Sequence, residues 1–157
     1  MENIIFIAED TGNSCDELLE ELLIRLNALY ILHRASHWQT HGITSYGDHL
    51  LFQRLYEPII DEIDTLAERM VSFVGMNSVD ACCITPGVNE FIQNWSAESP
   101  CPYERGVVAE RECIQCIEMC MAVIEASGES SLGWDDVLGG MASQHEEHIY
   151  LLEQRVQ

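Results

Sequence analysis

Histidines and carboxylates are the residues of this chain whose types and spacing could do chemistry. The segment SHWQTHGITSYGDH carries three histidines, His37, His41 and His49, and two carboxylates, Asp64 and Glu68, follow further along. Together they offer nitrogen and oxygen donors, which suit iron or zinc. A plainer interpretation also stands, because an acidic pair four residues apart often lies on a solvated helix face.

The spacing limits how these residues could share an ion. At 100° per residue, His49, Gln53, Asp64 and Glu68 fall on one helix face. His49 and Asp64 lie roughly 22 Å apart along that helix, whereas a metal–ligand bond is about 2 Å. Either another helix of the chain completes each end, or a second copy packs antiparallel across a two-fold axis. The composition of the two ends favours a second copy of the chain. The histidines His37 and His49 lie at one end, and the carboxylates lie at the other.

Helical periodicity dominates the elements that must position these residues. The first long helix opens at Ser14, which forms a capping box with Glu17, and is expected to close at Gly42. Its apolar stripe leads onto the histidines, and His33 within that stripe is interpreted as a hydrogen-bonded core residue rather than a ligand. The second helix is expected from about residue 45 to 73.

The second half of the chain predicts two more long helices after a long connection. Prolines and a glycine punctuate residues 76–103, where VNEFIQNW predicts a helix of two turns. The third long helix is expected over 104–126, and the fourth from Ser131 or Asp135 to the end. Two short links and one long crossover predict an all-α, ferritin-like four-helix bundle with a short extra helix, in one domain spanning 1–157.

The net charge of the chain limits the classes of ligand that it is expected to bind. The chain of 157 residues has a net charge of -20, and its seven basic residues are all arginines. Nucleic-acid binding depends on basic side chains that neutralise phosphates, so direct DNA binding is not expected, whereas cations are attracted. No apolar run is long enough to span a membrane. The N-terminal IIFIA is too short for a signal peptide, so a cytoplasmic protein is expected.

Cysteines supply an alternative function. The seven cysteines are odd in number and lack a secretion signal, which indicates reduced thiols. In CIQCIEMC, Cys113, Cys116 and Cys120 share one helix face. Such sulfur ligands suit Cu(I) or zinc in a metal-binding bundle without ferroxidase activity, but buried cysteines also act as small hydrophobic residues. A non-catalytic helical oligomer is the third interpretation.

Several motifs together resemble the Dps family, the DNA-binding proteins from starved cells, which are mini-ferritins. They are HWQTHG, His49 twelve residues after His37, DTLAER with Asp64 and Glu68, and the closing HEEHIYLLEQ. The resemblance implies a hollow homododecamer with ferroxidase centres, di-iron or mono-iron, shared across two-fold interfaces. It implies oxidation of Fe(II) by hydrogen peroxide or O2, storage of ferric mineral and protection against oxidative stress.

The same resemblance assigns residues and exposes two departures. It implies that His37 and His49 of one subunit bind iron with Asp64 and Glu68 of the partner subunit. Trp38 matches the tryptophan beside the centre, and Asp136 falls near the family's iron-entry pores. Gln53 stands where the family usually has an aspartate, which weakens the second iron position, and Glu57 is the candidate substitute. The lysine-rich tail that many members use to bind DNA is absent.

Overall fold

Five α-helices and one short 3-10 helix make up the computed structural model, which describes residues 14–156. They are α1 (Cys15–Trp38), α2 (Ser45–Phe73), η1 (Met76–Val79), α3 (Ala81–Glu98), α4 (Pro102–Ala126) and α5 (Leu132–Glu153). The predicted IIFIA segment lies outside the described residues. None of the described helices is both long and apolar enough to cross a membrane.

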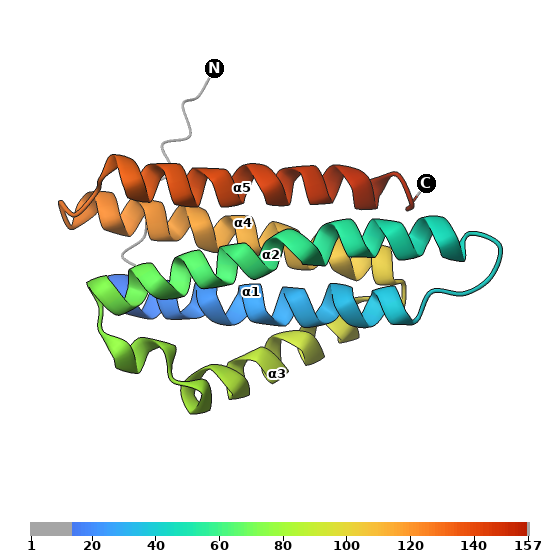
Figure 1. Ribbon diagram of the computed structural model, residues 1–157, viewed down its shortest axis with the longest axis horizontal. Helices are drawn as coiled ribbons and strands as arrows, with labels where there is room; N and C mark the ends of the chain where they lie inside the picture. The colour runs from blue at the N-terminus through green and yellow to red at the C-terminus, as the bar shows by residue number, and fades with distance from the viewer. Residues whose placement is uncertain (1–13, 157) are drawn as a thin grey trace, which may run out of the picture.

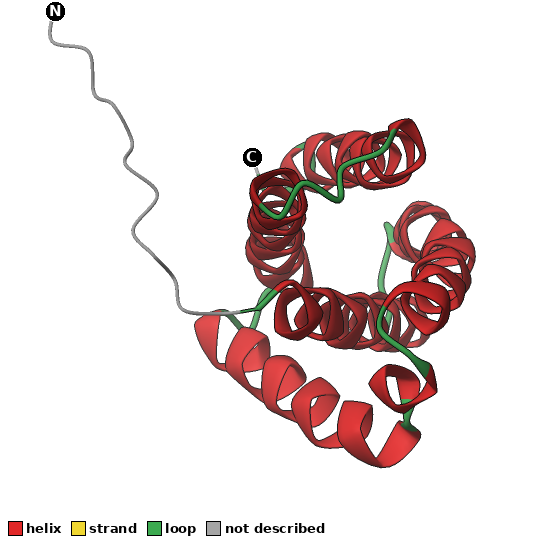
Figure 2. Ribbon diagram, turned by 90° about the vertical axis from the view of Figure 1, so that its left-hand side faces the viewer, coloured by secondary structure: helices red, strands yellow, loops and turns green. Residues whose placement is uncertain are grey.

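The four long helices α1, α2, α4 and α5 form a bundle (Figure 1). α1 and α2 run antiparallel, as do α4 and α5, while α2 and α4 run in the same direction at diagonal positions of the bundle. Seen end-on, α3 lies outside the bundle against α1 (Figure 2). One long crossover between diagonal helices is the ferritin-like connectivity, so the predicted architecture is confirmed.

Two helix starts match the capping signals in the sequence. The backbone N–H of Glu17 donates to Ser14 Oγ at 3.3 Å, and the Ser14 N–H donates to the Glu17 carboxylate at 2.9 Å. Ser131 caps α5, which resolves the two predicted starts. The predicted end of the first helix was wrong: α1 stops at Trp38, and Gly42 lies in the link with φ +83°. That left-handed backbone suits glycine and turns the chain into α2.

The crossover contains more helix than the sequence predicts. α3 has 18 residues rather than two turns, and it runs through Pro86 and Gly87. A Cβ at Gly87 would lie 2.9 Å from a methyl of Ile24, so glycine lets α3 approach α1 closely. Val88 and Trp95 are buried on the same helix. Their packing outweighs the weak helix propensity of the proline–glycine pair.

Thiols fill part of the core. Cys113, Cys116 and Cys120 are buried in the main hydrophobic cluster. The Cys116 and Cys120 thiols donate to the Leu18 carbonyl on α1, at 3.8 and 3.4 Å. This placement favours the interpretation of these cysteines as small buried residues.

A charged contact ties the C-terminal turn to the start of α2. The Arg155 guanidinium donates to the buried Asp48 carboxylate. Burial opposes ionisation, but hydrogen bonds from Thr44 and Tyr103 and the Arg155 charge lower the pKa of Asp48. This Asp48–Arg155 contact, called the clamp below, therefore anchors the helix turn that carries His49.

Candidate metal centre

His37 and His49 meet at one end of the bundle. Their rings stack with centroids 3.5 Å apart, one from the end of α1 and the other from the start of α2. His37 Nδ1 lies 2.8 Å from the His49 carbonyl, and His49 Nδ1 lies 3.2 Å from the His37 carbonyl. Because a carbonyl only accepts, each Nδ1 carries the proton and donates. Both Nε2 atoms then keep a lone pair for a metal, which is the usual anchoring of a histidine ligand.

Asp64 and Glu68 lie much further along α2, and both are exposed. Neither carboxylate forms a hydrogen bond or ion pair with another group among residues 14–156. The structure therefore brings the two histidines together but does not bring them to the two carboxylates within one chain. His41 lies apart from the pair in the link, where its Nδ1 contacts the Gln39 carbonyl at 3.0 Å.

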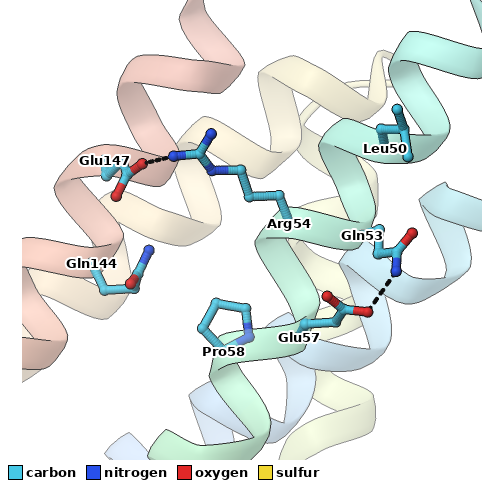
Figure 3. A pocket seen from close by; sticks show the side chains of 7 residues that line it. All are labelled: Leu50, Gln53, Arg54, Glu57, Pro58, Gln144 and Glu147. Atoms are coloured by element: carbon cyan, nitrogen blue, oxygen red, sulfur yellow. Dashed lines mark hydrogen bonds and ion pairs between the residues drawn. The ribbon is translucent and has the colours of Figure 1, made fainter.

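Gln53 faces an acidic neighbour one helical turn away (Figure 3). Its amide Nε2 donates to Glu57 Oε1 at 2.6 Å. Both residues line a surface hollow of about 500 Å³ between α2 and α5, together with Leu50, Arg54, Pro58, Gln144 and Glu147. The Arg54–Glu147 ion pair joins the two helices across this hollow. Gln53 thus holds a carboxylate near the position where the Dps resemblance expects one.

The other two expected residues lie at the surface. Trp38 is 67% exposed, and the Arg34 guanidinium lies over its ring at 5.0 Å. Asp136 is exposed on α5. It lines a second hollow between α2 and α5, of about 330 Å³, together with Pro58, Asp61, Glu62, Thr65, Val137, Gly140, Met141 and Gln144.

A second group of metal-binding side chains lies inside the bundle. Glu110 of α4 and His145 and His148 of α5 are fully buried, and one ligand atom from each lies within 4.8 Å of the other two. Glu110 Oε2 lies 2.5 Å from His145 Nδ1, and Glu110 Oε1 lies 3.0 Å from His148 Nδ1. His33 of α1 adds its Nε2 at 2.7 Å from Glu110 Oε1. His33 is thus a hydrogen-bonded core residue, as predicted.

The side chains of this buried group shift one another's pKa values. Burial alone would raise the pKa of Glu110, but the imidazoles of His145, His148 and His33 hold it well below its usual range. Burial alone would lower the pKa of His145, but the charges of Cys113 and Glu110 raise it well above its usual value. Burial lowers the pKa of His33. The buried Glu110 carboxylate therefore lies among three imidazoles that favour its ionised form.

Sequence reasoning missed this buried group. The segment HEEH enters the sequence interpretation only through the family resemblance, which assigns no role to His145 or His148. The available signal was the pair of histidines three residues apart, which lie on one helix face. Among the described residues, this is the one group of three His, Cys, Asp or Glu side chains that meets the 4.8 Å spacing. The cysteines of CIQCIEMC do not form such a group, so the alternative thiol site gains no support.

Comparison with known proteins identifies the fold. No protein-family model matches the chain. An uncharacterized protein in the bpoA2 5' region of Kitasatospora aureofaciens is 31% identical over 72 residues, which are 46% of this chain and 48% of that protein. The chain thus matches about half the length of this relative. The X-ray structure of Dps from Thermosynechococcus elongatus superposes with a TM-score of 0.70 at 19% identity, over 89% of this chain and 90% of that one. The chain therefore shares the all-α, ferritin-like fold of this Dps structure.

Proposed function

We propose that the protein is an iron-storing mini-ferritin that oxidises Fe(II). The observation that carries this proposal is the stacked pair His37 and His49, whose Nδ1 atoms are both anchored on backbone carbonyls. Two Nε2 atoms that are left free by the Nδ1 hydrogen bonds and held side by side are a preorganised half of a metal site. The ferritin-like fold supports the same assignment at the level of architecture.

Asp64 and Glu68 of the partner subunit complete the proposed centre. Both carboxylates are exposed, and in the described chain neither has an internal partner, so they are available to a second copy. An antiparallel two-fold contact along α2 brings the histidine end of one chain to the carboxylate end of the other. Imidazoles retain Fe(II), and carboxylates stabilise the harder Fe(III).

Iron is the substrate in the proposed reaction, and hydrogen peroxide or O2 is the oxidant. With peroxide, two Fe(II) ions each give up one electron, and one peroxide takes both electrons and two protons to leave as two waters. Pairing the electrons avoids release of hydroxyl radical. The ferric product collects inside a hollow homo-oligomer, a dodecamer by the Dps resemblance. The net charge of -20 favours cation uptake and disfavours direct DNA contact.

The test replaces one exposed ligand from each half of the site. His49→Ala and Glu68→Ala are each expected to slow ferric absorbance after Fe(II) and hydrogen peroxide are mixed, by at least about tenfold, because loss of a ligand exceeds loss of a supporting contact. His41→Ala is the matched control, since His41 is exposed nearby but lies outside the pair. Wild-type rates and stoichiometry in both ligand variants would contradict the proposal.

A further inference from the structure

The buried group around Glu110 has the features of a metal site that is complete within one chain. Its central donors are Glu110, His145 and His148, all at 0% exposure. Two imidazoles and one carboxylate are a donor set that binds divalent transition metals such as Zn²⁺ and Fe²⁺. Helix bundles commonly build such sites in the core from facing helices, as α4 and α5 do here.

The geometry allows an ion to enter this group with little movement. Glu110 now accepts from His145 Nδ1 at 2.5 Å and from His148 Nδ1 at 3.0 Å. An ion with bonds of about 2.1 Å needs ligand atoms roughly 3 to 4 Å apart. The two rings would therefore retreat by roughly 1 Å, and the ion would replace the protons between them and the carboxylate.

Supporting contacts already surround these three donors. His33 Nε2 donates to Glu110 Oε1 at 2.7 Å and orients the carboxylate. His145 Nε2 lies 3.4 Å from Glu62 Oε2, and His148 Nε2 lies 3.1 Å from the Gln144 amide nitrogen. A ligating histidine usually has its far nitrogen held by a carboxylate or another polar group. The far nitrogen of His145 lies near the Glu62 carboxylate without a hydrogen bond to it. His148 Nε2 now accepts from the Gln144 amide, so a metal on His148 Nδ1 would move the ring proton to Nε2 and require Gln144 to turn its amide oxygen toward it.

Two buried atoms remain unsatisfied in this network. Glu62 Oε2 and His33 Nδ1 are buried and make no hydrogen bond within the described chain. A partly satisfied polar network is costly in a core that could have been apolar. An ion that shifts the His145 ring could bring its Nε2–H into a hydrogen bond with Glu62 Oε2. A purely structural network leaves this carboxylate oxygen unsatisfied.

A surface hollow shares two of its lining residues with the contacts of this group. The 330 Å³ hollow between α2 and α5 is lined by Asp61, Glu62 and Asp136, which attract cations, and by Gln144. Glu62 and Gln144 are also the residues that face the far nitrogens of His145 and His148. The same two side chains therefore lie between solvent and the buried donors.

We propose that each chain binds one divalent transition-metal ion in its bundle core through Glu110, His145 Nδ1 and His148 Nδ1, with entry past Glu62 and Gln144. His33 and Glu62 are positioning residues in this site. The proposal does not depend on the shared surface centre, because none of its donors belongs to that centre.

The experiment titrates Co²⁺, whose visible absorption reports ligand geometry, into metal-free protein. The background variant His49→Ala/Asp64→Ala/Glu68→Ala removes exposed surface ligands, so its remaining Co²⁺ binding reports the core. We expect one Co²⁺ per chain in this background, and loss of binding when Glu110→Gln or His148→Gln is added. Glu62→Gln is expected to weaken Co²⁺ affinity by about 10- to 100-fold and keep the absorption spectrum.

Glu118→Gln is the matched control, because Glu118 is an exposed carboxylate on the same helix as Glu110. It should leave Co²⁺ affinity and spectrum unchanged. A background variant with native helical circular dichroism that binds no Co²⁺ would overturn the proposal. So would unchanged Co²⁺ affinity in both folded Glu62→Gln and folded His148→Gln. Failure of the surface ferroxidase would instead appear as unchanged iron oxidation in His49→Ala and Glu68→Ala.

Discussion

We predict that Gln53 limits the number of iron ions that the proposed surface centre can hold. Its amide oxygen is a neutral donor, and its amide nitrogen is committed to Glu57 at 2.6 Å. Gln53→Asp would place an anionic oxygen one turn after His49 and remove the hydrogen bond to Glu57. We expect tighter binding of a second iron at each centre and faster oxidation. Anaerobic Fe(II) titration should show a higher saturating stoichiometry than wild type.

Glu57→Gln is the matched control for this change. It alters the same hydrogen-bonded pair, but it removes a carboxylate instead of adding one. If Glu57 already serves as the substitute ligand, Glu57→Gln will lower the stoichiometry. Equal iron binding in wild type and Gln53→Asp would show that position 53 does not face the centre.

At the scale of elements, the Asp48–Arg155 clamp joins the start of α2 to the turn after α5. Asp48→Asn weakens this charge-assisted contact, and we expect it to lower the free energy of unfolding by about 1–3 kcal/mol at pH 7. The folded-state pKa of Asp48 is lowered despite burial, by hydrogen bonds from Thr44 and Tyr103 and by Arg155. The clamp's contribution is therefore full above the ordinary aspartate pKa of about 3.9 and is lost as pH falls through the lower folded value.

Urea unfolding followed by circular dichroism checks this expectation. The difference between wild type and Asp48→Asn should be constant near neutrality and should shrink below about pH 4. Asp135→Asn is a suitable control, because Asp135 is exposed in the first turn of α5 and outside the clamp. A difference that grows on acidification would rule out the clamp as its source.

The elements also show what periodicity and capping can predict. Ser14, Glu17 and the leucine stripe define α1 locally, so its start and buried face were predictable. The end of α1 and the length of α3 were not, because they depend on packing between helices, such as the approach of Gly87 to Ile24. Local signals mark a helix, whereas tertiary contacts decide how far it extends.

Sequence spacing indicated the pair His37 and His49 but not the buried group around Glu110. His37 and His49 are 12 residues apart, and each bonds the other's backbone. Glu110, by contrast, meets His33 across 77 residues and His145 across 35. Such contacts require the order of helices around the bundle, which a single helical stripe does not contain.

At the scale of the whole molecule, the proposed surface centre makes a quantitative prediction about mixed assemblies. A variant lacking His37 and His49 keeps its carboxylates, and one lacking Asp64 and Glu68 keeps its histidines. If the centre is shared across a two-fold axis, refolding an equal mixture should restore about a quarter of the wild-type sites, because half of the pairs are mixed and each has one intact site. Ferric absorbance after peroxide addition measures the recovery.

Each variant refolded alone is the control for the mixture, and both should stay inactive. A mixture as inactive as its components, but of native particle size, would place the four residues in centres that are not shared in this way. Size measurement of the same samples also tests the expected homo-oligomer.

The reactivity of the buried core thiols can be used to measure how often the bundle opens. Cys113, Cys116 and Cys120 are at most 1% exposed, whereas Cys82 and Cys83 lie at the surface of α3. A thiol reagent should label the outer pair at once and the inner three only when α4 separates from α1. Mass spectrometry of the slow labelling would then report the population of opened molecules in native buffer. Comparing the labelling rates of the buried thiols with and without bound metal would show how strongly the metal stabilises the closed bundle.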